Sequence, residues 1–144
     1  MRKELTDEWQ DRGEKKGVEY AILTDEITRA WSGMTTRQYK KLKGLKKENL
    51  RDNMSTTEII LNMLAETSTK DISQASKPET FEENIEVARR GGNVAGIAKQ
   101  ALEAETGKPV ITSQNAAQLN AVVTGMIESV VNAEDEKEKP IGDD

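Results

Sequence analysis

The chain has 144 residues, about one domain, and its 26 acidic and 21 basic side chains give a net charge of −5. It contains no cysteine and no histidine, which excludes a disulfide framework, a thiol nucleophile, an imidazole base and the usual zinc sites. No apolar run approaches the roughly 20 residues of a membrane-spanning helix, and no apolar stretch follows the basic N-terminus as in a secretory signal. These features predict a soluble cytoplasmic protein and leave its function to the motifs.

Apolar residues recur at helical spacing along the whole chain, and period-two alternation is nearly absent. The first segment, 2–12, carries the i,i+4 pair Leu5 and Trp9 and predicts one short docked helix. A second apolar stripe begins at Tyr20 and stops before Gly33, a residue that suits the left-handed backbone at a helix end. The stripe therefore predicts a second helix of about three turns.

Two capping boxes mark the next helix starts. Thr35 with Gln38, and Ser55 with Glu58, have the spacing at which each side chain satisfies the other's free backbone N–H. The first box predicts a helix that ends near Gly44.

The helix after the second box is predicted over 56–66, with an extension to 74 left open. Met54 and Ile59 occupy the two positions of a hydrophobic staple at its start. Its buried stripe is predicted to consist of Ile59, Ile60, Met63 and Leu64. Residues 73–80 then read as a polar loop, with Ser76 as a further candidate cap.

A long helix is predicted over 80–105, interrupted by Gly91 and Gly92. Two glycines inside a helix each cost about 1 kcal/mol relative to alanine, so they indicate either a kink or a very close helix crossing. Gly107 is the expected helix stop, and residues 109–112 are predicted as an extended strand or packed linker.

Ser113 is the predicted cap of a last helix with a wide apolar face, which serves either as the last core layer or as a homodimer surface. This face comprises Leu119, Val122, Val123, Met126, Ile127, Val130 and Val131. The predicted fold is a compact all-α bundle of five or six helices. It forms a single helical domain over 1–132, followed by a disordered acidic tail over 133–144.

Charge is strongly uneven along the chain. Residues 37–51 carry a net charge of +6, which leaves −11 for the remaining residues. The predicted nucleic-acid or partner-binding residues of this window are Arg37, Tyr39, Lys40, Lys41, Lys43, Lys46, Lys47 and Arg51. The cations suit DNA phosphates or an acidic protein face, and Tyr39 is placed to stack on a base. The alternative is a solvated lysine-rich face around the packed residues Leu42 and Leu45.

Other clusters favour structural interpretations. Glu79, Glu82, Glu83 and Glu86 lie at a predicted helix start, where the helix dipole favours acidic residues without any bound cation. Residues 89–93 lack the full pattern of a phosphate-binding loop. No catalytic constellation stands out, so we expect a protein that is not an enzyme and that has no cofactor or metal site.

The stretch 44–58, together with 33–43 and 59–67, resembles the C-terminal region of the DNA-damage-inducible protein D family. The resemblance is carried by the KGLKK core at 43–47, by Asn49, Asp52 and Met54, and by the S/T-x-x-E helix start. Weaker similarity covers RKEL at 2–5, YAI at 20–22 and FEEN…ARRGG at 81–92, and it fades beyond 106–120.

This resemblance implies a bacterial or phage-encoded protein of the SOS response to DNA damage. It implies a non-enzymatic modulator of the strand-exchange recombinase that acts on the recombinase filament on single-stranded DNA. Family members usually carry an N-terminal domain related to phage antirepressors, for which we expect no room in this chain. The assignment of the 37–51 window as the contact surface comes from its charge and not from the family.

Two other functions remain open. One is an autonomous nucleic-acid-binding module, or a phage regulatory or counter-defence factor, which binds DNA or RNA without any recombinase. The other is a structural dimerisation domain that uses the last predicted helix as its interface.

Overall fold

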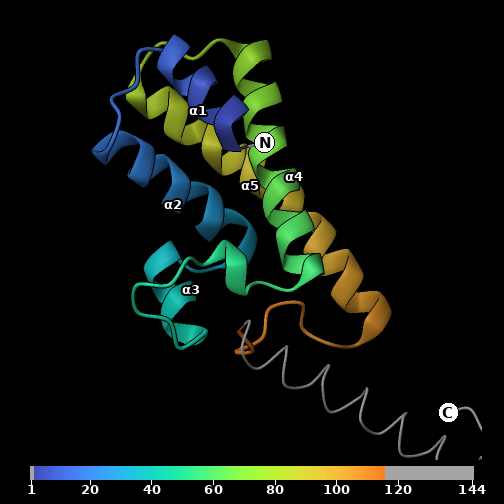
Figure 1. The fold of residues 1–144 in the computed structure, drawn as a ribbon. Helices are drawn as coiled ribbons and strands as arrows, with labels where there is room; N and C mark the ends of the chain where they lie inside the picture. The colour runs from blue at the N-terminus through green and yellow to red at the C-terminus, as the bar shows by residue number, and fades with distance from the viewer. Residues whose placement is uncertain (1, 116–144) are drawn as a thin grey trace, which may run out of the picture.

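The computed structural model describes residues 2–115, and within this range five α-helices pack together without any β-strand (Figure 1). They are α1 (Arg2–Asp11), α2 (Val18–Ser32), α3 (Thr36–Leu42), α4 (Thr56–Ser76) and α5 (Phe81–Thr106), with a short 3-10 turn, η1 (Arg51–Asn53), before α4. The all-α fold class is therefore confirmed. The last predicted helix, the domain boundary at 132 and the acidic tail lie outside the described residues.

The two longest helices, α4 and α5, form an antiparallel hairpin against which the other helices are arranged (Figure 1). Helix α2 packs mainly on α5, α1 packs on α4, and α3 follows α2 at the end of the hairpin where α4 begins. None of the helices in 2–115 combines the length and apolar character required to cross a membrane. The buried apolar core comprises Leu5, Trp9, Leu23, Ile27, Trp31, Tyr39, Met54, Leu61, Ala65, Ala88 and Ala95.

The helix boundaries follow local signals in the sequence. The capping boxes at Thr35 and Ser55 both form with their two reciprocal hydrogen bonds, and Gly33 closes α2 in the left-handed conformation at φ 82°. A third box, Thr80 with Glu83, starts α5 and was not predicted. Ser76 is not a helix start, because α4 continues through it and the polar loop is only a few residues long.

The predicted buried stripe of α4 is wrong at three of its four positions. Ile59 is half-buried, but Ile60, Met63 and Leu64 are 58%, 37% and 36% exposed. The inward face is instead the neighbouring stripe, which carries two apolar and four polar residues: Glu58, Leu61, Ala65, Glu66, Thr69 and Ser73. Because these polar side chains find hydrogen-bond partners inside the protein, apolar periodicity alone assigned the wrong face.

The glycines of α5 permit close helix approach, and they do not break the helix. A Cβ atom at Gly91 would lie 2.0 Å from Thr69 Oγ1 and 2.6 Å from the Thr69 backbone of α4. A Cβ at Gly92 would lie 2.5 Å from the Ala30 side chain and 2.6 Å from the Ile27 carbonyl oxygen of α2. Because these two positions carry no side chain, the backbone of α5 can approach the backbones of both α4 and α2 closely.

We expect Gly91→Ala to destabilise the protein, although alanine is the better helix former. The added methyl group meets the Thr69 backbone, which cannot move without shifting α4, and overpacking of this kind costs about 1–3 kcal/mol. Urea unfolding followed by tryptophan fluorescence measures the change. Asn93→Ala, at an exposed position of the same helix, is the matched control. A Gly91→Ala variant as stable as that control contradicts the close crossing.

Candidate nucleic-acid interface

A broad groove with a volume of about 810 Å³ lies between α2 and α3, with part of its wall supplied by the start of α1. Among the described residues that line it, five carry a positive charge and only Asp25 carries a negative one. The five cations of this basic groove are Arg2, Arg37, Lys40, Lys41 and Lys46. A concave surface with one dominant sign of charge concentrates ions of the opposite sign, so the groove is suited to anionic ligands.

The start of α3 is attached to α2 at the base of the groove. The Asp25 carboxylate on α2 accepts a hydrogen bond of 3.0 Å from the backbone N–H of Thr36, the first residue of α3. Arg37 and Lys41 follow on α3 one turn apart, both exposed. Because residues four apart share a helix face, these two cations lie on the same side of α3.

The chain turns sharply after α3 and brings one more lysine to the groove. The backbone N–H of Leu45 donates to the carbonyl oxygen of Lys40 at 2.9 Å, and Gly44 takes the left-handed conformation at φ 72° that this turn uses. The backbone N–H of Lys46 then donates to Glu48 Oε1 at 2.8 Å. Hydrogen bonds from backbone N–H groups lower the pKa of Glu48 below its ordinary value.

The structure divides the eight predicted site residues into separate groups. Four of them, Arg37, Lys40, Lys41 and Lys46, line the basic groove. Lys47 is exposed outside it, and Arg51 lines a neighbouring pocket. The remaining two, Tyr39 and Lys43, are buried.

The prediction that Tyr39 stacks on a base is wrong. Its side chain is fully buried, and its ring packs against Trp31 with 6.0 Å between the ring centroids. Its hydroxyl donates a hydrogen bond to Glu58 Oε2. Burial, together with the hydrogen bond and charge of Glu58, raises the pKa of Tyr39 above its ordinary value. Tyr39 is therefore a core residue that anchors α3.

The prediction that Lys43 contacts phosphates or a partner is also wrong. Its side chain is fully buried, and its Nζ donates to Glu58 Oε1 at 2.8 Å. The same ammonium lies 5.9 Å from the centre of the Tyr39 ring. Ammonium groups leave water only when a counter-charge and hydrogen bonds compensate them, so Lys43 serves the fold.

The same lysine also forms hydrogen bonds with the segment that follows α5. Lys43 Nζ donates a second hydrogen bond of 2.7 Å to the carbonyl oxygen of Gln114, and Asn115 Nδ2 donates to the carbonyl oxygen of Lys43 at 2.9 Å. Val110 and Ile111 in this segment pack partly buried against the core. Residues 109–112 thus form the packed linker, the second of the two predicted alternatives.

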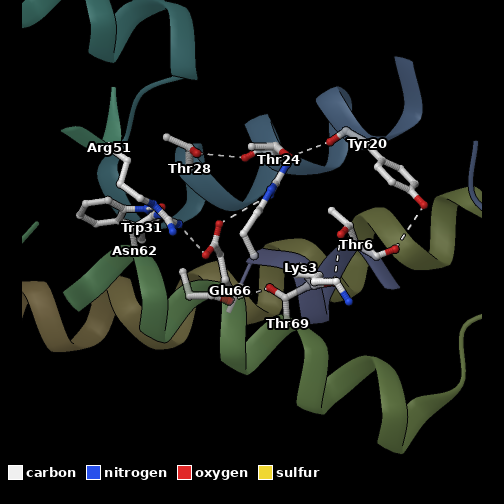
Figure 2. A network of polar contacts seen from close by, with 12 residues as sticks. Lys3, Thr6, Tyr20, Thr24, Thr28, Trp31, Arg51, Asn62, Glu66 and Thr69 are labelled. Atoms are coloured by element: carbon white, nitrogen blue, oxygen red, sulfur yellow. Dashed lines mark hydrogen bonds and ion pairs between the residues drawn. The ribbon is translucent and has the colours of Figure 1, made fainter. Parts of the chain in front are cut away.

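Arg51 pairs with a buried carboxylate on α4. Its Nη2 donates to Glu66 Oε1 at 2.7 Å, and Figure 2 shows Glu66 reaching from α4 toward Arg51, with Thr24 of α2 across from it. Arg2 joins the other oxygen, with 3.6 Å between its Nη1 and Glu66 Oε2. Two guanidinium groups therefore share one carboxylate at the inner side of the groove.

Arg2 is a groove residue that the sequence did not reveal. It lies 35 positions before Arg37 in the chain, and no motif or charge run links the two. Its Nη2 donates to Thr24 Oγ1, and its guanidinium lies 5.3 Å from the centre of the Trp9 ring. Burial lowers the pKa of Arg2 from its ordinary value, while Glu66 raises it. Only the packing of α1 on α4, from which Arg2 reaches Thr24 of α2, brings this charge to the groove.

One carboxylate at the acidic start of α5, that of Glu83, caps the helix. Glu83 Oε1 accepts hydrogen bonds from the backbone N–H groups of Glu79 at 2.7 Å and Thr80 at 3.1 Å. These hydrogen bonds lower the pKa of Glu83. Within 2–115, no group of three or more carboxylates is arranged to hold a metal ion.

A comparison of the chain with protein-family models finds no match, and searches of curated proteins and of solved structures find none either. The basis for a functional conclusion is therefore the geometry and charge of the basic groove.

We expect Lys43→Met to lower the free energy of unfolding by about 3 kcal/mol, because it leaves the buried Glu58 carboxylate without its counter-charge. Lys47→Met removes an exposed charge from the same window and is expected to change stability by less than about 0.5 kcal/mol. Urea denaturation followed by circular dichroism compares the two variants. Equal stabilities would contradict the structural role of Lys43.

Proposed function

We propose that this chain is a non-enzymatic interaction protein of the DNA damage response, which binds single-stranded DNA and modulates a recombinase filament assembled on it. The observation that carries the proposal is the gathering of five cations on one groove of a protein whose net charge is −5. Lys40, Lys41 and Lys46 supply flexible point charges, and the guanidinium of Arg37 suits bidentate contact with a phosphate.

A single strand suits this groove better than a duplex. Binding to nucleic acid strengthens with the number of phosphates that cations neutralise, and the groove offers only a few cations on an acidic protein. A single strand needs only a short positively charged track.

The recombinase filament enters the proposal through the resemblance of residues 44–58 to the DNA-damage-inducible protein D family. Two residues of the similar region, Lys43 and Glu58, form a buried ion pair. These two residues therefore stabilise the fold and are not available to a partner. The surface available to DNA or to an acidic face of the recombinase is formed by Arg37, Lys40, Lys41 and Lys46.

A second candidate function uses the same groove without the recombinase. The groove cations can contact phosphates without a partner protein, so an autonomous nucleic-acid-binding module or a phage regulatory or counter-defence factor is the alternative. The two candidates differ in whether binding to DNA alone accounts for the activity. The dimerisation alternative rests on the last predicted helix, outside the described residues.

We expect the affinity for a fluorescein-labelled single strand to fall with salt, with a log–log slope of roughly three if four cations meet phosphates. Arg37→Gln/Lys41→Gln removes two exposed groove cations and is expected to reduce this slope by about 1.4. Fluorescence anisotropy at several salt concentrations measures both slopes. Lys108→Gln, an exposed lysine outside the groove, should leave the slope unchanged. No salt-dependent binding by the unaltered chain contradicts the proposal.

We expect the chain to change the rate of strand exchange catalysed by a bacterial recombinase on single-stranded DNA. The effect should shrink with Arg37→Gln/Lys41→Gln and persist with Lys108→Gln, because only the first variant alters the basic groove. Strand exchange followed by gel electrophoresis provides the measurement. DNA binding by the chain without any change in exchange, even at excess protein, would favour the autonomous module.

A further inference from the structure

The positive charge of the basic groove is largely uncompensated by the described residues. Asp25 is the one carboxylate among the described residues that line the groove, and it accepts a hydrogen bond from the backbone of α3. Arg37, Lys40 and Lys41 form no ion pair within residues 2–115. Carboxylates from outside this range can therefore approach these three cations.

The described part of the chain ends beside the groove. Lys43 Nζ donates a hydrogen bond of 2.7 Å to the carbonyl oxygen of Gln114, and Asn115 Nδ2 donates one of 2.9 Å to the carbonyl oxygen of Lys43. Gly44, which follows Lys43 in the chain, lines the groove. The residues that come after Asn115 are therefore attached at the edge of the groove.

The sequence after this point contains a short stretch with the opposite charge. Residues 134–144 carry six acidic and two basic side chains, a net charge of −4. We call them the acidic segment. Since the whole chain has a net charge of −5, residues 1–133 have a net charge of only −1. The groove lining has five cations and one carboxylate, so the charge of the acidic segment matches the excess in the groove.

The acidic segment can reach the groove from its point of attachment. Glu134 lies 19 positions after Asn115. A straight helix of that length would separate the two residues by about 28 Å, and a flexible chain by about 24 Å on average. The acidic segment spans about 36 Å when extended, which is more than either separation. Its carboxylates can therefore return to the groove in both cases.

Attachment to the same chain strengthens a contact made of weak ion pairs. Exposed ion pairs contribute little individually, but a segment on a short flexible connection has an effective concentration in the millimolar range. Non-specific binding to nucleic acid has dissociation constants of about 10⁻⁴–10⁻⁶ M. The acidic segment is therefore concentrated enough near the groove to compete measurably with a strand.

We propose that the acidic segment of this chain occupies the basic groove when no nucleic acid is bound, and that a single strand displaces it. The carboxylates of the segment then lie against Arg37, Lys40, Lys41 and Lys46. A strand carries one phosphate charge per nucleotide, whereas two lysines reduce the charge of the acidic segment, so a strand can win the competition. This inference rests on the proposed function and deepens it, because it adds a competitor that limits access to the groove.

The first test neutralises the acidic segment in the full-length chain. We expect a fluorescein-labelled single strand to bind this variant about fivefold more tightly than the unaltered chain at low salt. High salt should remove the difference, because it screens exposed charges. Fluorescence anisotropy measures both affinities. The substitutions are Glu134→Gln, Asp135→Asn, Glu136→Gln and Glu138→Gln.

The matched control changes the net charge by the same amount at the opposite end of the helical hairpin. Its four positions are exposed and lie near the connection between α4 and α5, away from α3 (Figure 1). This control should change the affinity less than about twofold, because distant exposed charges are screened. Its substitutions are Asp71→Asn, Glu79→Gln, Glu82→Gln and Glu86→Gln. Equal gains for the two variants, or no gain for the neutralised segment, would overturn the inference.

The second test needs no nucleic acid. A carbodiimide joins a carboxylate to a lysine amine that it contacts, and mass spectrometry identifies the joined residues. We expect cross-links within one chain from the acidic segment to Lys40, Lys41 or Lys46, and their loss at high salt. Lys77, an exposed lysine outside the groove, is the control and should give none of these cross-links. Cross-links only between two copies, or none to the groove lysines, would overturn the inference.

The two tests separate failure of the inference from failure of the proposed function. Cross-links to the groove lysines in a chain that binds no strand at low salt would overturn the proposed function and support the intramolecular contact. A chain that binds a strand with equal affinity before and after neutralisation of the acidic segment would overturn the inference and leave the proposed function standing.

Discussion

The arrangement of the groove depends on one buried carboxylate, Glu58. Its Oε1 accepts hydrogen bonds from the backbone N–H of Ser55 at 3.1 Å and from Lys43 Nζ at 2.8 Å, while Oε2 accepts from the Tyr39 hydroxyl. Through Lys43 it also holds the carbonyl oxygen of Gln114. The Glu58–Lys43 pair therefore joins three segments by hydrogen bonds: the start of α4, the end of α3 and the segment after α5. Loss of Lys43 would leave Glu58 as an uncompensated buried ion, so this ion pair holds the end of α3 in place.

This constraint determines which basic residues reach the surface. Lys43 and Tyr39 face inward to Glu58, so the turns of α3 that remain exposed present Arg37 and Lys41. A helix cannot direct every residue of a basic run to one side, since successive residues are about 100° apart. The basic window is thus neither a uniform contact surface nor only a solvated face. It divides into buried residues that stabilise the fold and exposed residues that line the basic groove.

The interior of this protein is made with polar contacts and close backbone approach as much as with apolar area. Ser73 donates to the buried Glu8 at 2.6 Å, and Thr69 donates to the Ala65 carbonyl oxygen at 2.8 Å. The paired glycines of α5 let α2 and α4 approach at backbone distance. With 35% apolar residues, the chain has limited apolar area, and these contacts let polar faces of α4 serve as core. Because the polar residues of α4 face the core, Ile60 and Leu64 on the other side of the helix are exposed.

The sequence by itself determined several helix starts and ends, because capping boxes and helix-ending glycines act within a few residues. The starts of α3 and α4 and the ends at Gly33 and Gly107 could all be predicted. Burial and the membership of the groove could not be predicted, because they depend on contacts between distant residues. Only the tertiary structure buried Lys43 against Glu58, 15 positions away, and brought Arg2 to the groove beside α3. Short sequence motifs determine local hydrogen bonding, whereas the pairing of distant charges depends on which helix faces pack together.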